Sequence, residues 1–208
     1  MICVAENKNF KKRKIQKRLF TVSDNPKNIS GFHEMIGNIQ TPLVKLPGLA
    51  KHLGIGNLLL KDESHRFGLN AFKVLGASYA MDRQIKKHPQ IKVFCTATDG
   101  NHGRAVAWMA RKLNRRAIIY LPKGTAPARI KTIEKEGGEV FITEQNYDIT
   151  VKMANRRVNE RNKTNGDHLW SLIQDTAWRG YEEIPLPSDS LRKLSNCSFE
   201  SLPSKKAL

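Results

Sequence analysis

Long hydrophobic runs and cysteine pairs are missing from this sequence of 208 residues. No apolar stretch approaches the roughly 20 residues that a helix needs to span a bilayer. The first ten residues, MICVAENKNF, contain no apolar segment behind a basic one, as a secretory signal would. The three cysteines, Cys3, Cys95 and Cys197, form no CxxC pair. These absences argue against a membrane or secreted protein, a disulfide framework and a zinc site, and they favour the reducing cytoplasm.

Nucleotide-binding and metal-binding motifs are absent as well. The sequence contains neither a Walker A pattern nor GxGxxG, which weighs against binding of nucleoside triphosphates or NAD. Its histidines show no HxxxH or HExxH spacing, so we expect no metal centre. Cys95 lies in the apolar run VFCTA, which favours a buried structural thiol.

Acidic residues are few, and the excess of basic residues is distributed unevenly along the chain. The chain has 36 Lys and Arg against 19 Asp and Glu, a net charge of +17. Between Lys8 and Arg18 there are seven basic residues and no acid. An excess of basic residues of this size suggests nucleic acid as a binding partner. A basic stretch with few aromatic residues is more typical of a solvated tail, so we do not expect nucleic acid as the partner.

Hydrophobic patterning indicates an α/β fold. Short apolar strands without alternation are separated by stretches with helical periodicity, which favours an open parallel sheet covered on both faces, a three-layer αβα arrangement. The predicted strands cover residues 57–61, 92–97, 117–122, 139–143 and 169–174. The predicted helices cover residues 71–88, the stretch after the DGNHG segment to about residue 113, 126–138 and 148–163.

Both ends of the chain differ from this regular part. We expect a flexible basic arm over residues 1–20, one α/β region over 21–185, and a tail over 186–208 that is unrelated and disordered. That tail is rich in Ser, Lys and Leu without a clear period. In an open parallel sheet, ligands bind at the carboxyl ends of the strands, so chemistry is expected in the loops that follow them.

Lys73 is the first candidate for that chemistry. Its helical neighbours Gly76, Ala77 and Ala80 are small, and it lies away from the polar side of the predicted helix. A desolvated lysine can serve as a Schiff-base nucleophile or a proton carrier. The pattern alone favours the simpler interpretation, a surface lysine whose stem is buried and whose ammonium is solvated.

Two loops that follow predicted strands carry the other candidates. The segment Thr98-Asp99-Gly100-Asn101-His102-Gly103 opens a helix, where free N–H groups favour an anion such as a carboxylate. An ordinary capped turn explains it equally, and for His102 local packing or hydrogen bonding is the favoured role. Asp175 follows the last predicted strand, where it could act as a general acid or base or simply form a turn.

Four segments, taken together, resemble one known family. They are KDESHRFGLNAFKVLG, TATDGNHGRAVAWMA, YLPKGTAPARI and QDTAWRGYEEIP. Their order is that of diaminopropionate ammonia-lyases, pyridoxal-phosphate enzymes with the tryptophan-synthase-β fold (fold type II). The resemblance runs from about Thr41 to Pro185. The aspartate in TDGNHG and the DTAWxGYEEIP stretch distinguish this family from the serine and threonine dehydratases.

The resemblance implies a role for each matching position. Lys73 matches the lysine that bonds to pyridoxal phosphate and takes the substrate α-proton, and Asn101 matches the asparagine beside the cofactor's 3′-oxygen. Backbone amides of residues 98–102 (Thr98, Asp99, Gly100, Asn101 and His102) match the cradle for the substrate carboxylate. Asp99 matches an acid/base on the opposite face of the substrate that contacts its second amine, and Asp175 matches a further active-site carboxylate.

The implied reaction is the α,β-elimination of 2,3-diaminopropionate to pyruvate and ammonia. The resemblance also implies a small amino-acid substrate, pyridoxal phosphate as the cofactor and a homodimer for the full-length enzyme. The family pattern continues beyond Pro185, through a glycine-rich phosphate loop that we do not find here. We therefore expect an incomplete, truncated enzyme that is inactive alone. The alternatives are a serine/threonine dehydratase-like enzyme and a non-catalytic basic protein associated with nucleic acid.

Overall fold

The computed structural model describes residues 26–165, 168–176, 178 and 181. The predicted arm over residues 1–20 and the predicted tail over 186–208 lie outside the described residues. Cys3 and Cys197 lie outside them as well. Cys95 is fully buried, and burial raises the pKa of its thiol to about 12. This confirms the prediction of a buried thiol at that position.

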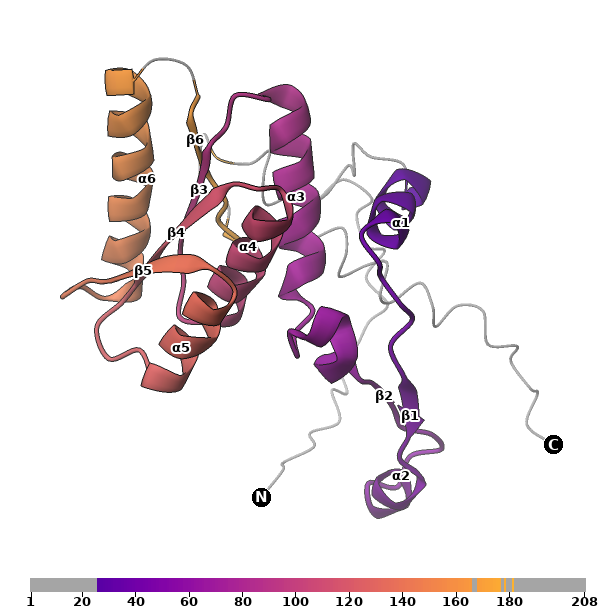
Figure 1. Ribbon diagram of the computed structural model, residues 1–208. Coiled ribbons are helices and arrows are strands. Elements are labelled where there is room, and N and C mark those ends of the chain that lie inside the picture. Colours follow the sequence, from indigo (N-terminus) through magenta and orange to yellow (C-terminus); the bar gives the residue numbers. More distant parts are fainter. Residues whose placement is uncertain (1–25, 166–167, 177, 179–180, 182–208) are drawn as a thin grey trace.

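A four-stranded parallel sheet forms the centre of the fold (Figure 1). Its spatial order is β5-β4-β3-β6, with every neighbouring pair parallel. The central strand β3 is buried at all five positions, as expected of a parallel sheet covered on both faces. The strands are β3 (Val93–Ala97), β4 (Arg116–Leu121), β5 (Gly138–Ile142) and β6 (Trp170–Leu172).

Helices cover the two faces unequally, and the resulting three layers confirm the predicted αβα arrangement. Among the described helices, α1, α3, α4 and α5 lie on one side of the sheet, whereas α6 lies on the other (Figure 1). Alternate residues of β3 serve the two cores: Phe94 packs in the larger cluster, and Cys95 packs in the smaller one beside Val158 of α6. The helices are α1 (Pro26–Met35), α3 (Lys73–Lys87), α4 (Asn101–Lys112), α5 (Pro127–Lys135) and α6 (Tyr147–Asn165).

The prediction for residues 57–61 was wrong in one respect. A strand is present there, β2 (Leu59–Lys61), but it pairs antiparallel with β1 (Leu43–Lys45) in a separate two-stranded ribbon. The interval to the next strand was interpreted as one crossover helix. The predicted helix is present as α3, but the 3₁₀ helix η1 (Glu63–Gly68) precedes it in this interval. A further short helix, α2 (Pro47–His52), lies between β1 and β2. Leu60 is half exposed, unlike a residue in a buried parallel strand.

Several predicted boundaries also shift. The predicted helix 126–138 ends at Lys135, because Gly137 takes a left-handed φ of 91° that closes the helix and Gly138 begins β5. The predicted strand 169–174 ends at Leu172, although the chain stays beside β3 through the hydrogen bond from Ile173 N to Cys95 O. Such shifts of a few residues are ordinary at element ends.

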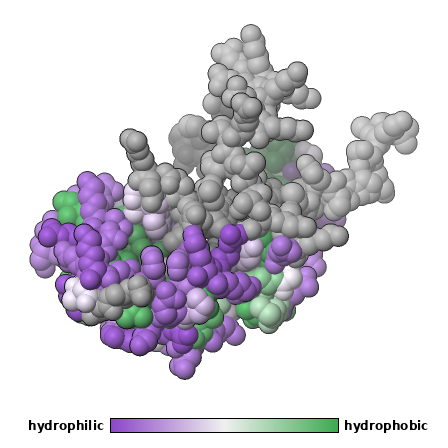
Figure 2. Space-filling model, turned by 90° about the horizontal axis from the view of Figure 1, so that it is seen from above, coloured by the Kyte–Doolittle hydropathy of each residue, from purple (hydrophilic) through white to green (hydrophobic). Residues whose placement is uncertain are grey.

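On the face seen in Figure 2, the described residues that are not covered are largely hydrophilic, with hydrophobic side chains in separate patches. Isolated exposed apolar residues are normal on soluble domains and carry no assignment by themselves. None of the described helices is long and apolar enough to cross a membrane.

Candidate active site

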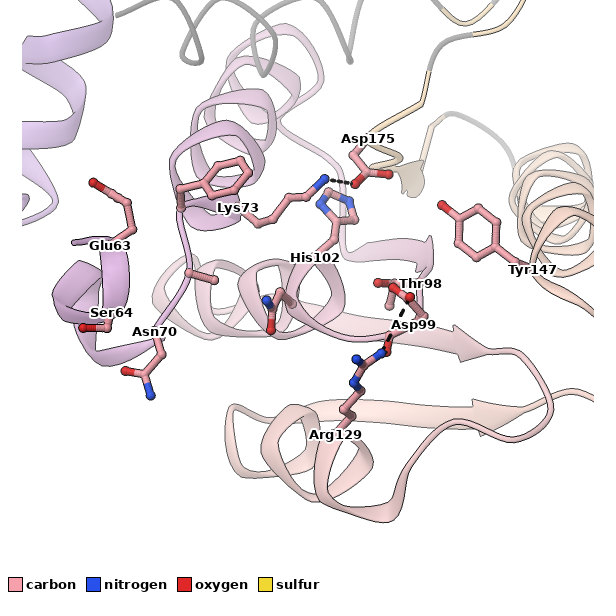
Figure 3. Close-up of a pocket in the computed structure, with 13 residues that line it drawn as sticks. Glu63, Ser64, Asn70, Lys73, Thr98, Asp99, His102, Arg129, Tyr147 and Asp175 are labelled. Atoms are coloured by element: carbon pink, nitrogen blue, oxygen red, sulfur yellow. Dashed lines mark hydrogen bonds and ion pairs between the residues drawn. The ribbon is translucent and has the colours of Figure 1, made fainter. Parts of the chain in front are cut away.

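A cavity of about 490 Å³ lies where three helices begin (Figure 3). Lys73 is the first residue of α3, Asn101 the first of α4 and Tyr147 the first of α6, and all three line the cavity. Because helix N-termini present free N–H groups and positive dipole ends, their convergence favours an anionic ligand. The cavity is lined by Glu63, Ser64, Asn70, Ala71, Phe72, Lys73, Thr98, Asp99, Asn101, His102, Arg129, Tyr147 and Asp175.

The structure therefore brings most of the candidate residues together. Lys73, the Thr98-to-His102 loop and Asp175 meet at one cavity although they come from three separate parts of the sequence. Gly100 of this loop is buried and does not line the cavity, and an added Cβ there would lie 3.2 Å from Cδ of Arg129. The shared cavity makes a joint chemical role feasible.

Lys73 points inward, toward a carboxylate. Its ammonium donates a hydrogen bond to Oδ2 of Asp175 (Figure 3). The side chain of Lys73 is 29% exposed and that of Asp175 is 17% exposed. The interpretation that the pattern alone favoured, a surface lysine with a solvated ammonium, is therefore wrong. Because Lys73 points inward, its amine lies in the cavity.

Asp175 and His102 form the rear wall of the cavity. Burial works to raise the pKa of Asp175, but attraction from His102 and Lys73 outweighs it, and the pKa lies below its usual value. Burial lowers the pKa of His102. The His102 ring bonds through Nε2 to the carbonyl oxygen of Ile173 at 2.8 Å. Because a carbonyl only accepts, Nε2 carries the proton. His102 thus fixes the segment that presents Asp175, in agreement with the favoured role of local hydrogen bonding.

The loop before α4 leaves the N-terminus of that helix open. Thr98 Oγ1 accepts a hydrogen bond from the N–H of Gly100 at 3.1 Å, and no side chain in the described part of the structure caps α4. Asp99 is 74% exposed at the rim, where Arg129 Nη1 donates to its backbone oxygen at 2.7 Å and lies 3.6 Å from Oδ2. Asn101 is exposed at the wall. The N–H groups at the start of α4 are thus placed at the cavity, and anion binding by them stays a prediction.

Two polar networks hold the segment that leads into Lys73. Arg104 of α4 donates to the carbonyl oxygens of Leu69 at 3.0 Å and Gly68 at 3.3 Å, and Glu136 binds the same guanidinium at 3.1 Å. The buried Arg66 bonds to Glu63 at 2.7 Å within η1. A buried, paired arginine is costly to disturb, so both networks restrict where Lys73 can lie.

Sequence reasoning gave no role to three further residues at the site: Gln174, Tyr147 and Arg129. Gln174 is 1% exposed, and its side-chain amide pairs with both the N–H and the carbonyl of Ala97, at 3.1 and 2.8 Å. The side chain of Gln174 thus takes the place that a backbone peptide of β6 would take beside the last residue of β3. Arg129 and Tyr147 follow the predicted strands 117–122 and 139–143. The rule that loops after parallel strands carry function was the one signal that pointed to them.

Comparison with known proteins agrees on one family. The model of the family described as pyridoxal-phosphate dependent enzyme matches residues 34–186. The diaminopropionate ammonia-lyase of Salmonella typhimurium is 44% identical over 179 residues, which cover 76% of this chain and 43% of the relative. The one from Escherichia coli K12 is 42% identical over 172 residues, which cover 74% and 42%. The chain thus spans less than half the length of these relatives.

A solved structure agrees with both the fold and the family. It is the diaminopropionate ammonia lyase from Escherichia coli in complex with an aminoacrylate–PLP azomethine reaction intermediate. The TM-score is 0.76 at 36% sequence identity, with 92% of this chain and 53% of that chain covered. The tryptophan-synthase-β type of fold expected from the resemblance is therefore confirmed.

Proposed function

The chain belongs to the family of pyridoxal-phosphate dependent enzymes, and on that premise we propose that it is a carbon–nitrogen lyase acting on 2,3-diaminopropionate. The overall reaction takes up one water and releases pyruvate and two molecules of ammonia. The relatives named diaminopropionate ammonia-lyase, 42% and 44% identical over about three quarters of this chain, support this substrate. The observation that carries the proposal is the cavity in which Lys73 and Asp175 meet the Asp99 loop.

The donor groups of the cavity fit the aldehyde and ring end of pyridoxal phosphate. A primary amine, Lys73, lies at the wall, and Asn101 lies at the uncapped start of α4. Lys73 would hold the cofactor covalently, and Asn101 would lie beside its 3′-oxygen. When bound, the cofactor supplies an electron sink that withdraws electrons from the substrate Cα.

Each side chain then has a defined task. Lys73 takes the proton from Cα, and the N–H groups of residues 98–102 hold the substrate carboxylate. Asp99 acts on the opposite face, where it moves a proton and contacts the amine that leaves. Asp175 lies beside Lys73 and keeps a negative charge close to the reacting centre.

The charges of the cavity favour a substrate with two ammonium groups. Asp99 is at the rim and Asp175 is inside, so a second ammonium on the substrate finds a carboxylate to bind. Such a charge-assisted hydrogen bond is roughly twice as strong as a neutral one. Serine carries a hydroxyl in that place and would bind less well.

Other features of the proposed enzyme extend beyond the site. Residues 21–185 would form its α/β region, the native assembly would be a homodimer, and the enzyme would work in the cytoplasm. No observation favours the nucleic-acid alternative, because the basic stretch between Lys8 and Arg18 lies outside the described residues. Salt-dependent binding that depends on residues 1–20 would be its signature.

Borohydride trapping tests the cofactor assignment. The purified chain is incubated with pyridoxal phosphate, reduced, digested and mapped by mass spectrometry, and the adduct is expected on Lys73. Lys73→Arg should abolish it, whereas Lys86→Arg, at a surface lysine of the same helix that is 69% exposed, should not. An adduct on other lysines with none on Lys73 would contradict the assignment.

Product analysis tests the reaction. A version of the enzyme extended to the full length of the relatives and loaded with the cofactor is given 2,3-diaminopropionate or serine, and pyruvate and ammonia are measured. We expect two ammonia per pyruvate from diaminopropionate and faster turnover of it than of serine. Faster turnover of serine would instead establish the dehydratase-like alternative.

A further inference from the structure

The Gln174 side-chain amide has one allowed orientation, and this decides how Tyr147 is used. Oε1 of Gln174 accepts from the N–H of Ala97 at 3.1 Å, and Nε2 donates to the carbonyl oxygen of Ala97 at 2.8 Å. A backbone N–H can only donate and a carbonyl can only accept. Exchanging the two amide atoms would therefore break both bonds. Nε2 is fixed as the donor, and its second hydrogen reaches the hydroxyl of Tyr147 at 3.1 Å.

The hydroxyl proton of Tyr147 is left for a ligand. Because the Tyr147 oxygen accepts from Gln174, its own proton points elsewhere. Within residues 26–165, 168–176, 178 and 181, no second hydrogen-bond partner of this hydroxyl is present. Tyr147 lines the cavity, and its hydroxyl faces the space between Asp99 and Asp175 (Figure 3). Burial and the nearby carboxylates raise the pKa of Tyr147, so the hydroxyl keeps its proton at neutral pH.

A neutral donor that keeps its proton requires an acceptor, and an amino-acid ligand offers its carboxylate. Asp99 and Asp175 cannot hold a carboxylate, because like charges repel. The N-terminus of α4, which begins with the cavity-lining Asn101 and has no side-chain cap among the described residues, favours one. We propose that Tyr147 binds the α-carboxylate of the substrate through its hydroxyl and that Gln174 is the positioning residue that aims it. This inference rests on the proposed function for the substrate class alone.

Tyr147→Phe tests the contact, because it removes one oxygen and keeps the ring. The full chain is titrated without cofactor, and the backbone amide signals of Asn101 and Gly103 are followed by NMR. The ligands are 2,3-diaminopropionate, serine and 1,2-diaminoethane, the last of which is diaminopropionate without its carboxylate. Loss of a hydrogen bond to a charged group should raise Kd about tenfold or more for the two amino acids. Affinity for 1,2-diaminoethane should stay within about twofold, since its amines do not use the hydroxyl.

Tyr120→Phe is the matched control, because Tyr120 loses the same atom in the cluster under α6, away from the cavity. It should leave all three affinities unchanged. Equal weakening of all three ligands by Tyr147→Phe, unchanged amino-acid affinities, or wild-type protein that binds neither amino acid would each overturn the proposal. Trapping on Lys73 is a separate measurement. A chain that binds the amino acids through Tyr147 but fails to form the adduct refutes the proposed function and not this contact.

Discussion

Lys73 and Asp175 lie 102 positions apart in the sequence, and the ammonium of Lys73 donates a hydrogen bond to Oδ2 of Asp175. Lys73 begins α3, and Asp175 follows β6 at the carboxyl edge of the sheet. Their contact therefore joins the start of α3 to the segment that follows β6. It also places a carboxylate next to the amine that the proposed chemistry requires.

Asp175→Asn is expected to reveal this pair through the pH dependence of stability. Attraction from His102 and Lys73, working against burial, holds the pKa of Asp175 below its usual value. A lowered folded-state pKa means that the unfolded chain binds the proton first. The pair should therefore contribute about 1 kcal/mol at neutral pH, and this is lost as the pH falls below about 4. Urea unfolding of both proteins between pH 7 and 3 measures the difference, and a difference that does not change with pH would contradict the prediction.

His102→Gln is expected to flatten the stability profile at mildly acidic pH. Burial lowers the pKa of His102, with Asp175 opposing and Lys73 adding to the effect. As the pH falls below the unfolded value near 6.5, the unfolded chain binds the proton first and the fold loses stability. Between pH 7 and 5, the free energy of unfolding of the variant should therefore fall by about 1 kcal/mol less than that of the wild type. His33 is also buried with a lowered pKa, so part of the slope remains.

The exposed His65 provides the control for that experiment. Its side chain is 60% exposed, so His65→Gln makes the same exchange of histidine for glutamine without changing a buried group. Chemical denaturation at pH 7 and 5 measures all three proteins. Identical slopes for His102→Gln and the wild type would show that His102 takes up its proton without cost in the fold.

Gly103→Ala is expected to destabilise the fold and disturb the cavity. An added Cβ would lie 2.5 Å from Cγ2 of Thr98 and 2.8 Å from Cγ2 of Ile119. Overpacking of this kind costs about 1–3 kcal/mol, and here it pushes α4 away from Thr98 in the cavity wall. Gly31→Ala in α1 is the control, because nothing lies within 4 Å of its added Cβ. Thermal unfolding should show a lower Tm for Gly103→Ala and an unchanged or higher one for Gly31→Ala.

Gln174→Leu is expected to cost more than an ordinary core substitution of similar size. The change leaves the N–H and the carbonyl oxygen of Ala97 without their side-chain partner in a buried place. Each unsatisfied buried group costs about 1–3 kcal/mol. Urea unfolding should show a loss of at least about 2 kcal/mol. Gln145→Leu at an exposed glutamine should change stability little, and equal losses in both variants would refute the special role of Gln174.

Much of the α/β region could be predicted from local patterns. Apolar runs such as VFCTA mark strands that are buried on both faces, and helical periodicity marks the segments between them. The strand at Leu59–Lys61 was assigned to the wrong sheet because a short apolar run does not specify its partner. Pairing depends on where η1 and α3 turn the chain, and these turns depend on residues far away, such as Arg104 holding the carbonyl oxygen of Leu69.

The candidate site divides in the same way. The motifs around Lys73, Asp99 and Asp175 are local, and their order along the chain was enough to indicate the family and its cofactor. Tyr147 belongs to none of the segments that carry the resemblance, and Gln174, although it opens the QDTAWRGYEEIP segment, was given no role there. Their importance arises from a hydrogen bond across 27 positions, which no pattern within one segment contains.

The sequence by itself determined the αβα layering, the resemblance to pyridoxal-phosphate enzymes and the residue types that carry the chemistry, because periodicity and motif order are local properties. Only the tertiary structure decided that Lys73 turns inward to Asp175 and that the hydroxyl of Tyr147 accepts a hydrogen bond from the side-chain amide of Gln174. Both depend on which carboxylates, carbonyls and amides meet after the sheet has formed. Burial then fixes their partners, since a polar group away from water must bind whatever the fold brings within reach.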